Sequence, residues 1–94
     1  TYSGRHIYGQ LFRAGTSAGA NYEEASAAES KPDFIHKMQI SLKELREAFW
    51  WLRFISKVQL IPENDPELVF LLKENRELLN IVGKSVSTAK KNKQ

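Results

Sequence analysis

The sequence predicts an all-α protein, an up-and-down bundle whose helices cover about residues 5–28, 31–60 and 66–90. In all three segments apolar residues recur at spacings of three and four, which is typical of the buried face of an amphipathic helix. No Asn-Gly or Asp-Gly pair and no sustained polar–apolar alternation indicates a β-hairpin. Three such helices joined by short connections form an antiparallel bundle.

The composition indicates a single small domain, residues 1–94. Of these 94 residues, 41% are apolar and 27% charged, and the formal net charge is +3. The absence of cysteine excludes a disulfide framework, a thiolate zinc site and a cysteine nucleophile.

The ends of the chain carry two further expectations. The first residue is Thr1 rather than Met, so we expect that initial residues of the gene product are missing, and residues 91–94 form a basic tail that we expect to fray. No apolar run approaches the ~20 residues of a membrane span, and no signal peptide opens the chain. We therefore expect a cytoplasmic, soluble protein that does not bind membranes.

The first predicted helix, residues 5–28, is rich in small residues between Ala14 and Ala20. Gly15 and Gly19 lie four apart, on one face, and a glycine inside a helix costs roughly 1 kcal/mol relative to alanine. We expect that the close approach of another helix or subunit at these two glycines offsets this free-energy cost. A break between two short helices is the alternative.

The second predicted helix, residues 31–60, begins with a capping Ser30 and a proline in its first turn. Its apolar residues follow a heptad pattern at Ile35, Met38, Leu42, Leu45, Phe49 and Leu52. Trp50, Trp51 and Phe54 widen this apolar surface beyond what one neighbouring helix covers. An additional helix before residue 1, a partner subunit, or both would cover the three aromatic residues.

The third predicted helix, residues 66–90, has Asp65 as its cap and Pro66 as its first residue. Apolar residues again recur at spacings of three and four, and Asn75 falls among them. A polar residue in such a position typically fixes the register of packing.

Two stretches of the sequence resemble a known family. They are QLFRAGTSAGANYEEA, residues 10–25, and a second part that runs from SKPDFIHKM through LKELRE to Trp51 and Leu52. Both resemble the small bacterial four-helix-bundle proteins named for open reading frames in intervening sequences of 23S rRNA genes. The resemblance is specific over about residues 5–60 and extends over 61–90 only in pattern.

The resemblance implies an up-and-down four-helix bundle whose first helix precedes the present residue 1 and is missing or disordered here. It also implies a barrel-like homopentamer. A related branch, the accessory protein of diversity-generating retroelements, is a basic pentamer that binds nucleic acid and a reverse transcriptase. For most members of the family no biochemical activity is established.

The residues predict no catalytic, metal or cofactor site. A di-iron centre requires two carboxylate-x-x-His pairs, and only Asp33 and His36 form one. The hydroxyl groups of Thr16 and Ser17 are expected to bond to carbonyls four residues earlier in the helix. From the resemblance we expect structural polar groups that bond between helices, with ion pairs to Arg13 or Lys43; this set is Arg13, Asn21, Glu24 and Glu44.

The sequence therefore favours a non-enzymatic homo-oligomeric scaffold, whose partner is RNA, DNA or a nucleic-acid enzyme. Five subunits at +3 each would carry +15 around one axis and attract phosphates without reading bases. The candidate phosphate-binding residues are Lys37, Arg53, Lys57, Lys84, Lys90 and Lys91. The alternative is an enzyme, or a carrier of a small molecule or metal, with a polar site between helices near Asn21, Glu24 and His36.

Overall fold

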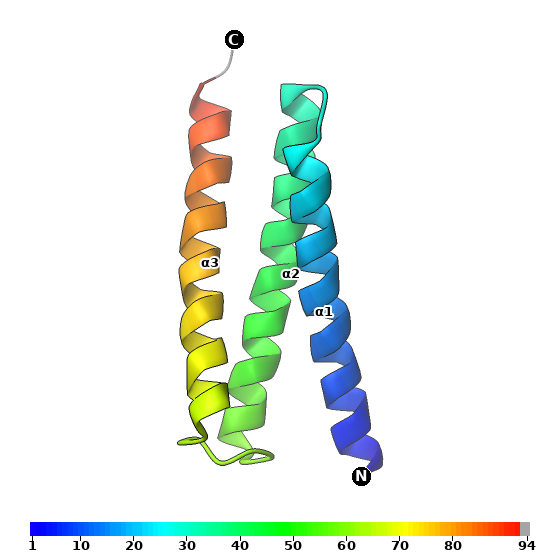
Figure 1. Ribbon diagram of the computed structural model, residues 1–94, viewed down its shortest axis with the longest axis vertical. Coiled ribbons are helices and arrows are strands. Elements are labelled where there is room, and N and C mark those ends of the chain that lie inside the picture. The colour runs from blue at the N-terminus through cyan, green and yellow to red at the C-terminus, as the bar shows by residue number, and fades with distance from the viewer. Residues whose placement is uncertain (93–94) are drawn as a thin grey trace.

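The computed structural model describes residues 1–92, which form α1 (Tyr2–Ser26), α2 (Lys31–Lys57) and α3 (Pro66–Lys91). The three helices run up, down and up along the 50 Å axis of the molecule (Figure 1). Within the described residues there is no strand. The predicted all-α fold with three long helices is confirmed.

Each helix begins at a side chain that caps its first turn. Oγ1 of Thr1 accepts a hydrogen bond from the Gly4 N–H at 2.9 Å, so α1 starts three residues before its predicted beginning. Ser30 Oγ accepts from the N–H of Asp33 at 3.2 Å, and Asp65 Oδ2 accepts from the N–H of Leu68 at 3.1 Å. These two caps lie where the sequence predicted them.

The helix ends differ from the prediction by a few residues. α2 ends at Lys57 rather than at residue 60 because Gln59 adopts a left-handed conformation (φ 55°), and the N–H of Leu60 bonds to the carbonyl of Ile55 at 3.0 Å. α3 continues to Lys91, so the predicted basic tail begins inside the helix. The rest of that tail beyond residue 92 lies outside the described residues.

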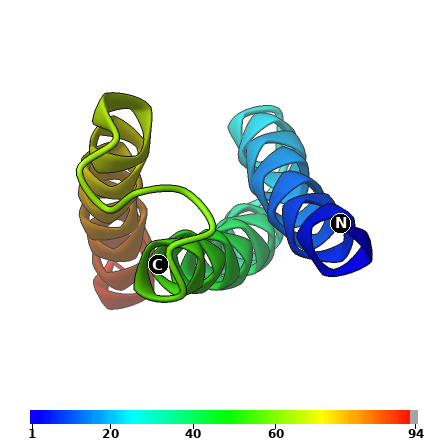
Figure 2. The same ribbon diagram turned by 90° about the horizontal axis from the view of Figure 1, so that it is seen from below.

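The helix α2 is the centre of the molecule. α1 and α3 pack on two sides of it, and no Cα atom of α1 comes within 8 Å of one in α3. Seen from below, the three helices form an open V with α2 at the vertex (Figure 2). The arrangement is that of an up-and-down bundle in which one position, between α1 and α3, is not filled by residues 1–92.

The core divides into two apolar clusters along α2. The upper cluster joins alanines of α1 to Met38 and Leu45 of α2 and to two valines of α3. The lower cluster contains Leu52, Ile55 and Leu68. Small side chains on α1 allow α2 to approach closely, and Ser41 Oγ donates a hydrogen bond to the carbonyl of Ala18 at 2.8 Å.

The two glycines do not make the predicted close helix contact within the described residues. A Cβ atom built on Gly15 or Gly19 would meet no atom within 4 Å, because α1 turns its alanines toward α2 and its glycines toward the open side. The alternative of a broken helix is also wrong, since α1 is continuous. Both glycines line a cavity of about 400 Å³ between α1 and α3, together with Leu45, Leu78 and Ile81.

Asn75 of α3 lies in the wall of this open side, in an adjoining cavity of about 290 Å³. Its Oδ1 is buried without a hydrogen-bond partner within the described residues. A buried acceptor without a donor costs free energy, so a hydrogen-bond donor placed between α1 and α3 would stabilise the fold.

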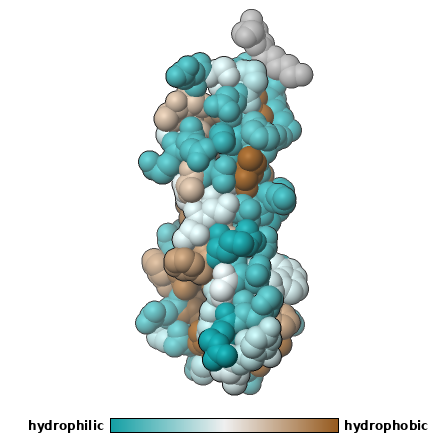
Figure 3. Space-filling view, turned by 90° about the vertical axis from the view of Figure 1, so that its right-hand side faces the viewer, coloured by the Kyte–Doolittle hydropathy of each residue, from teal (hydrophilic) through white to brown (hydrophobic). Residues whose placement is uncertain are grey.

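The surface on the α1 side is mostly hydrophilic, with separate hydrophobic patches between polar groups (Figure 3). Within residues 1–92 no helix has the length and apolar character that crossing a membrane requires.

Candidate nucleic-acid interface

Four basic side chains follow one line along the outward face of α2. They are separated by three, seven and four residues, so they share a face of the helix, and all four are exposed. We call this set the cationic stripe; it consists of Lys43, Arg46, Arg53 and Lys57. At 1.5 Å per residue the stripe is about 21 Å long. Trp50 lies on the same line, between Arg46 and Arg53.

No acidic residue interrupts the cationic stripe, because the acids of this part of α2 point toward α1. Arg13 Nη1 lies 3.3 Å from Oε1 of Glu44, and Arg13 Nη2 donates to Glu47. Ser17 Oγ also contacts Glu44, at 3.4 Å. The packing of α1 on α2 thus pairs both carboxylates with Arg13, and of the stripe residues only Lys43 contributes to lowering the pKa of Glu47.

The guanidinium of Arg13 also changes the acidity of Glu47. Its hydrogen bond lowers the pKa of Glu47, and the indole N–H of Trp51, which donates to the same carboxylate at 3.2 Å, lowers it further. The carboxylates in turn raise the pKa of Arg13. Glu47 therefore remains charged and holds both Arg13 and Trp51 in place.

These contacts predict acid sensitivity that depends on Glu47. A carboxylate with a lowered folded-state pKa stabilises the fold above its ordinary value of 4.5, and this stabilisation is lost as pH falls through the lower folded-state pKa. We expect Glu47→Gln to lower the melting temperature at neutral pH and to show a smaller further loss on acidification than the wild type. The measurement is thermal unfolding at a series of pH values, from neutral pH to below the ordinary carboxylate pKa of 4.5. Glu77→Gln, an exposed glutamate of α3, is the control, and identical pH profiles for wild type and Glu47→Gln would contradict the role.

The aromatic residues beside the stripe form a fixed cluster. The rings of Trp50 and Phe54 are stacked, with centroids 5.4 Å apart and planes at 10°. Trp51 packs edge-on against Trp50 at 4.9 Å and also contacts His6 of α1. Trp50 is nevertheless 50% exposed, and Trp51 and Phe54 are half-buried. Residues 1–92 thus leave the three aromatic side chains partly uncovered, as the sequence indicated.

A fifth cation reaches the stripe from α3. The ring of Phe49 has the guanidinium of Arg53 at 5.6 Å from its centroid and that of Arg76 at 5.7 Å. The contact of Arg76 with Phe49 joins α3 to α2 and places a cation of α3 beside the stripe. Arg76 was missed by the sequence reasoning because its position depends on how the two helices align, and no local signal shows this.

The six predicted phosphate-binding residues do not form one surface. Arg53 and Lys57 belong to the cationic stripe. Lys37 is instead paired with Glu24 of α1, with 2.6 Å between Nζ and Oε1, and this partner raises its pKa. Lys84 is exposed on α3, and Lys90 and Lys91 lie at the far end of the molecule.

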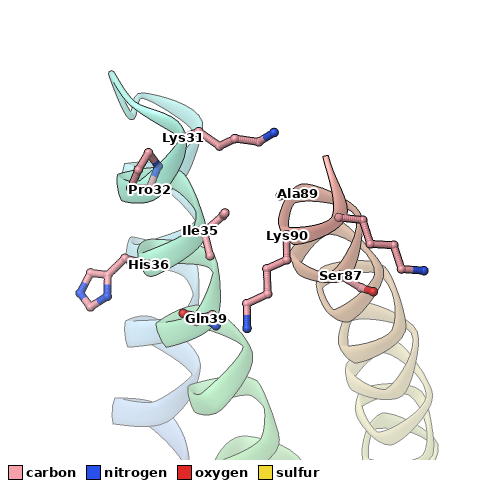
Figure 4. Close-up of a pocket in the computed structure, with 9 residues that line it drawn as sticks. Lys31, Pro32, Ile35, His36, Gln39, Ser87, Ala89 and Lys90 are labelled. Atoms are coloured by element: carbon pink, nitrogen blue, oxygen red, sulfur yellow. The ribbon is translucent and has the colours of Figure 1, made fainter. Parts of the chain in front are cut away.

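An open pocket of about 920 Å³ separates the start of α2 from the end of α3 at this far end. Lys31 extends from α2 toward α3, and Lys90 extends toward Gln39, whereas His36 points away from α3 (Figure 4). The start of α2 offers an anion few free donors, since Pro32 has no N–H and the N–H of Asp33 is bonded to Ser30. We therefore place the candidate interface on the outward face of α2 rather than in this pocket.

The alternative polar site is not assembled within the described residues. The side-chain amide of Asn21 donates to the carbonyl of Ser17 in its own helix, at 2.9 Å, and not to another helix as expected. Glu24 is exposed and pairs with Lys37 rather than with Arg13 or Lys43 as expected, while His36 lies near the start of α2 and points away from α3. Residues 1–92 contain no group of three His, Cys, Asp or Glu that could hold a metal ion. The hydroxyl of Thr16 donates to the carbonyl of Phe12, as predicted, whereas that of Ser17 donates to Glu44 of α2 instead of to a carbonyl of its own helix.

Comparisons with known proteins agree with this architecture. Residues 4–84 match the family model described as 23S rRNA-intervening sequence protein. Among solved structures, the chain is similar to a protein of unknown function from the S23 ribosomal protein family of Bacteroides thetaiotaomicron, with 31% identity and a TM-score of 0.77. That match covers 85% of this chain and 72% of the other. No curated protein matches the chain.

Proposed function

This chain belongs to the 23S rRNA-intervening sequence protein family, and we propose that it is a non-enzymatic bundle protein that self-associates and binds nucleic acid. The observation that carries this proposal is the cationic stripe of α2. Four exposed cations share one face, and the acids of the same segment are bound by Arg13 of α1. A row of cations without interspersed acids suits a polyanion backbone, which binds by releasing its counterions.

Self-association is supported by apolar side chains that the three helices leave uncovered. Large apolar residues remain exposed on the open side between α1 and α3, among them Phe12, Leu71, Leu78 and Ile81. An exposed apolar surface of this kind typically packs against another helix or subunit. We propose the homopentamer that the family resemblance implies, in which five copies repeat the stripe around one axis and the total charge is +15.

A salt titration tests the nucleic-acid proposal. We expect the logarithm of the association constant to fall linearly with the logarithm of salt concentration, with a slope of roughly −0.9 for each duplex phosphate contacted. The four stripe cations and Arg76 then predict a slope of about −4 to −5 per engaged subunit. The measurement is fluorescence anisotropy of a labelled oligonucleotide duplex.

Light scattering on the same sample measures the assembly, with a mass of five times 10.8 kDa expected. A monomer at all concentrations would contradict self-association, and a protein that ignores DNA and RNA at low salt would contradict nucleic-acid binding.

A further inference from the structure

We propose that the stacked pair Trp50–Phe54 is a platform for an unpaired base, so that the outward face of α2 takes single-stranded nucleic acid. This inference rests on the proposed function and names the substrate class of the same surface. It concerns the one aromatic side chain that lies on the line of the cationic stripe.

The ring of Trp50 is held in place before any ligand arrives. Phe54 supports it by parallel stacking, and Trp51 supports it edge-on. Trp51 is itself fixed by its hydrogen bond to Glu47, which Arg13 binds from α1. A ring that is already ordered loses little conformational entropy on binding, and Trp50 as a residue remains 50% exposed.

The position of Trp50 within the stripe suits a strand rather than an isolated base. Arg46 lies four residues before it and Arg53 three residues after it, so a cation lies about one helical turn away on each side. Phosphates on both sides of a stacked base would meet these guanidinium groups. Alternation of stacking rings with cations is the general means by which proteins hold single strands without reading their sequence.

A duplex cannot use the ring in this way, because the faces of its bases are stacked on one another and only base edges and phosphates are accessible from outside. A second copy of the chain is a poor occupant as well, since a symmetric contact through this face would set the cations against themselves. The apolar residues that self-association would bury lie on the other side of α2, around the opening between α1 and α3.

The test compares single-stranded and duplex oligonucleotides of equal length by fluorescence anisotropy at one salt concentration. We expect Trp50→Leu to weaken single-strand binding roughly 5- to 150-fold, the range for losing one base–aromatic stack, and to leave duplex affinity and the salt slope unchanged. Trp50→Phe is expected to retain most of the single-strand affinity. Tyr8→Leu, which removes an exposed aromatic ring of α1 that lines a cavity on the open side between α1 and α3, is the matched control and should change neither affinity.

The outcomes separate this inference from the proposed function. If Trp50→Leu leaves single-strand affinity unchanged, or lowers single-strand and duplex affinity equally in a variant that retains its circular dichroism, the platform is wrong and nucleic-acid binding stands. If the wild type binds neither oligonucleotide, the proposed function itself fails. Binding to vesicles containing phosphatidylserine without binding to oligonucleotides would assign the face to a lipid surface and overturn both.

Discussion

Replacing Ile55 by alanine is expected to lower the free energy of unfolding by about 2–5 kcal/mol, the range for truncating a large aliphatic side chain in a core. Ile55 is 1% exposed and belongs to the lower cluster of the core, where α2 packs against Leu68 of α3. Ile7 and Leu11 of α1 contact the same cluster, so all three helices lose packing together. Small domains are stable by only about 5–15 kcal/mol, so this one change removes a large part of the total.

The measurement is urea unfolding followed by circular dichroism, and Ile81→Ala is the matched control. Ile81 is 59% exposed on α3, where the same substitution is expected to change the free energy of unfolding by less than about 0.5 kcal/mol in the isolated chain. Should a partner subunit cover Ile81, its replacement would instead make unfolding more dependent on protein concentration. Equal losses from the two substitutions would contradict the packing of α3 on α2 described here.

The sequence predicted the helices well because the signals that start them are local. Ser30 and Asp65 cap α2 and α3 through backbone N–H groups only three residues away, so a short stretch of sequence contains the whole interaction. The end of α2 was placed wrongly for the opposite reason. The chain turns there through Gln59 in a left-handed conformation, and no glycine marks the position.

The side of α1 that packs on α2 could not be predicted, because alanine and glycine alternate in its small-residue segment. Ala14 and Ala18 lie one position before Gly15 and Gly19, and one residue rotates a side chain by about 100° around a helix. Either pair could face α2 by size alone. In the structure the alanines are buried there, and the glycines line the cavity between α1 and α3.

The candidate site was predicted only where one helix determines it. Arg53 and Lys57 lie on a line that the spacing of α2 alone defines. Lys37 was assigned to phosphate binding, yet it pairs with Glu24 across two helices, and Arg76 reaches the stripe only through the contact of Phe49 with α3. Contacts between helices depend on their relative alignment, which a periodic pattern of apolar residues leaves open.

Reversing two stripe charges with Arg46→Glu and Arg53→Glu is expected to weaken nucleic-acid binding at least about 100-fold, because two charge-assisted phosphate contacts become repulsive. The magnitude of the salt slope should fall by about 1.8 for the two cations lost. Both positions are exposed and lie inside α2, away from its ends, so helix formation is retained. Binding is measured by anisotropy, and circular dichroism checks the fold.

The matched control reverses Lys84 and Lys90, two predicted phosphate-binding residues that lie on α3 outside the cationic stripe. Both double variants lower the formal charge from +3 to −1, since each substitution changes it by two. Net charge alone would weaken binding equally in the two variants, because long-range attraction depends on the total. If nucleic acid binds at a local interface on α2, binding weakens mainly when the charges of Arg46 and Arg53 are reversed. Equal losses would therefore remove the argument for a site on α2, and a larger loss from the α3 variant would move the interface to the end of the molecule where Lys90 lies.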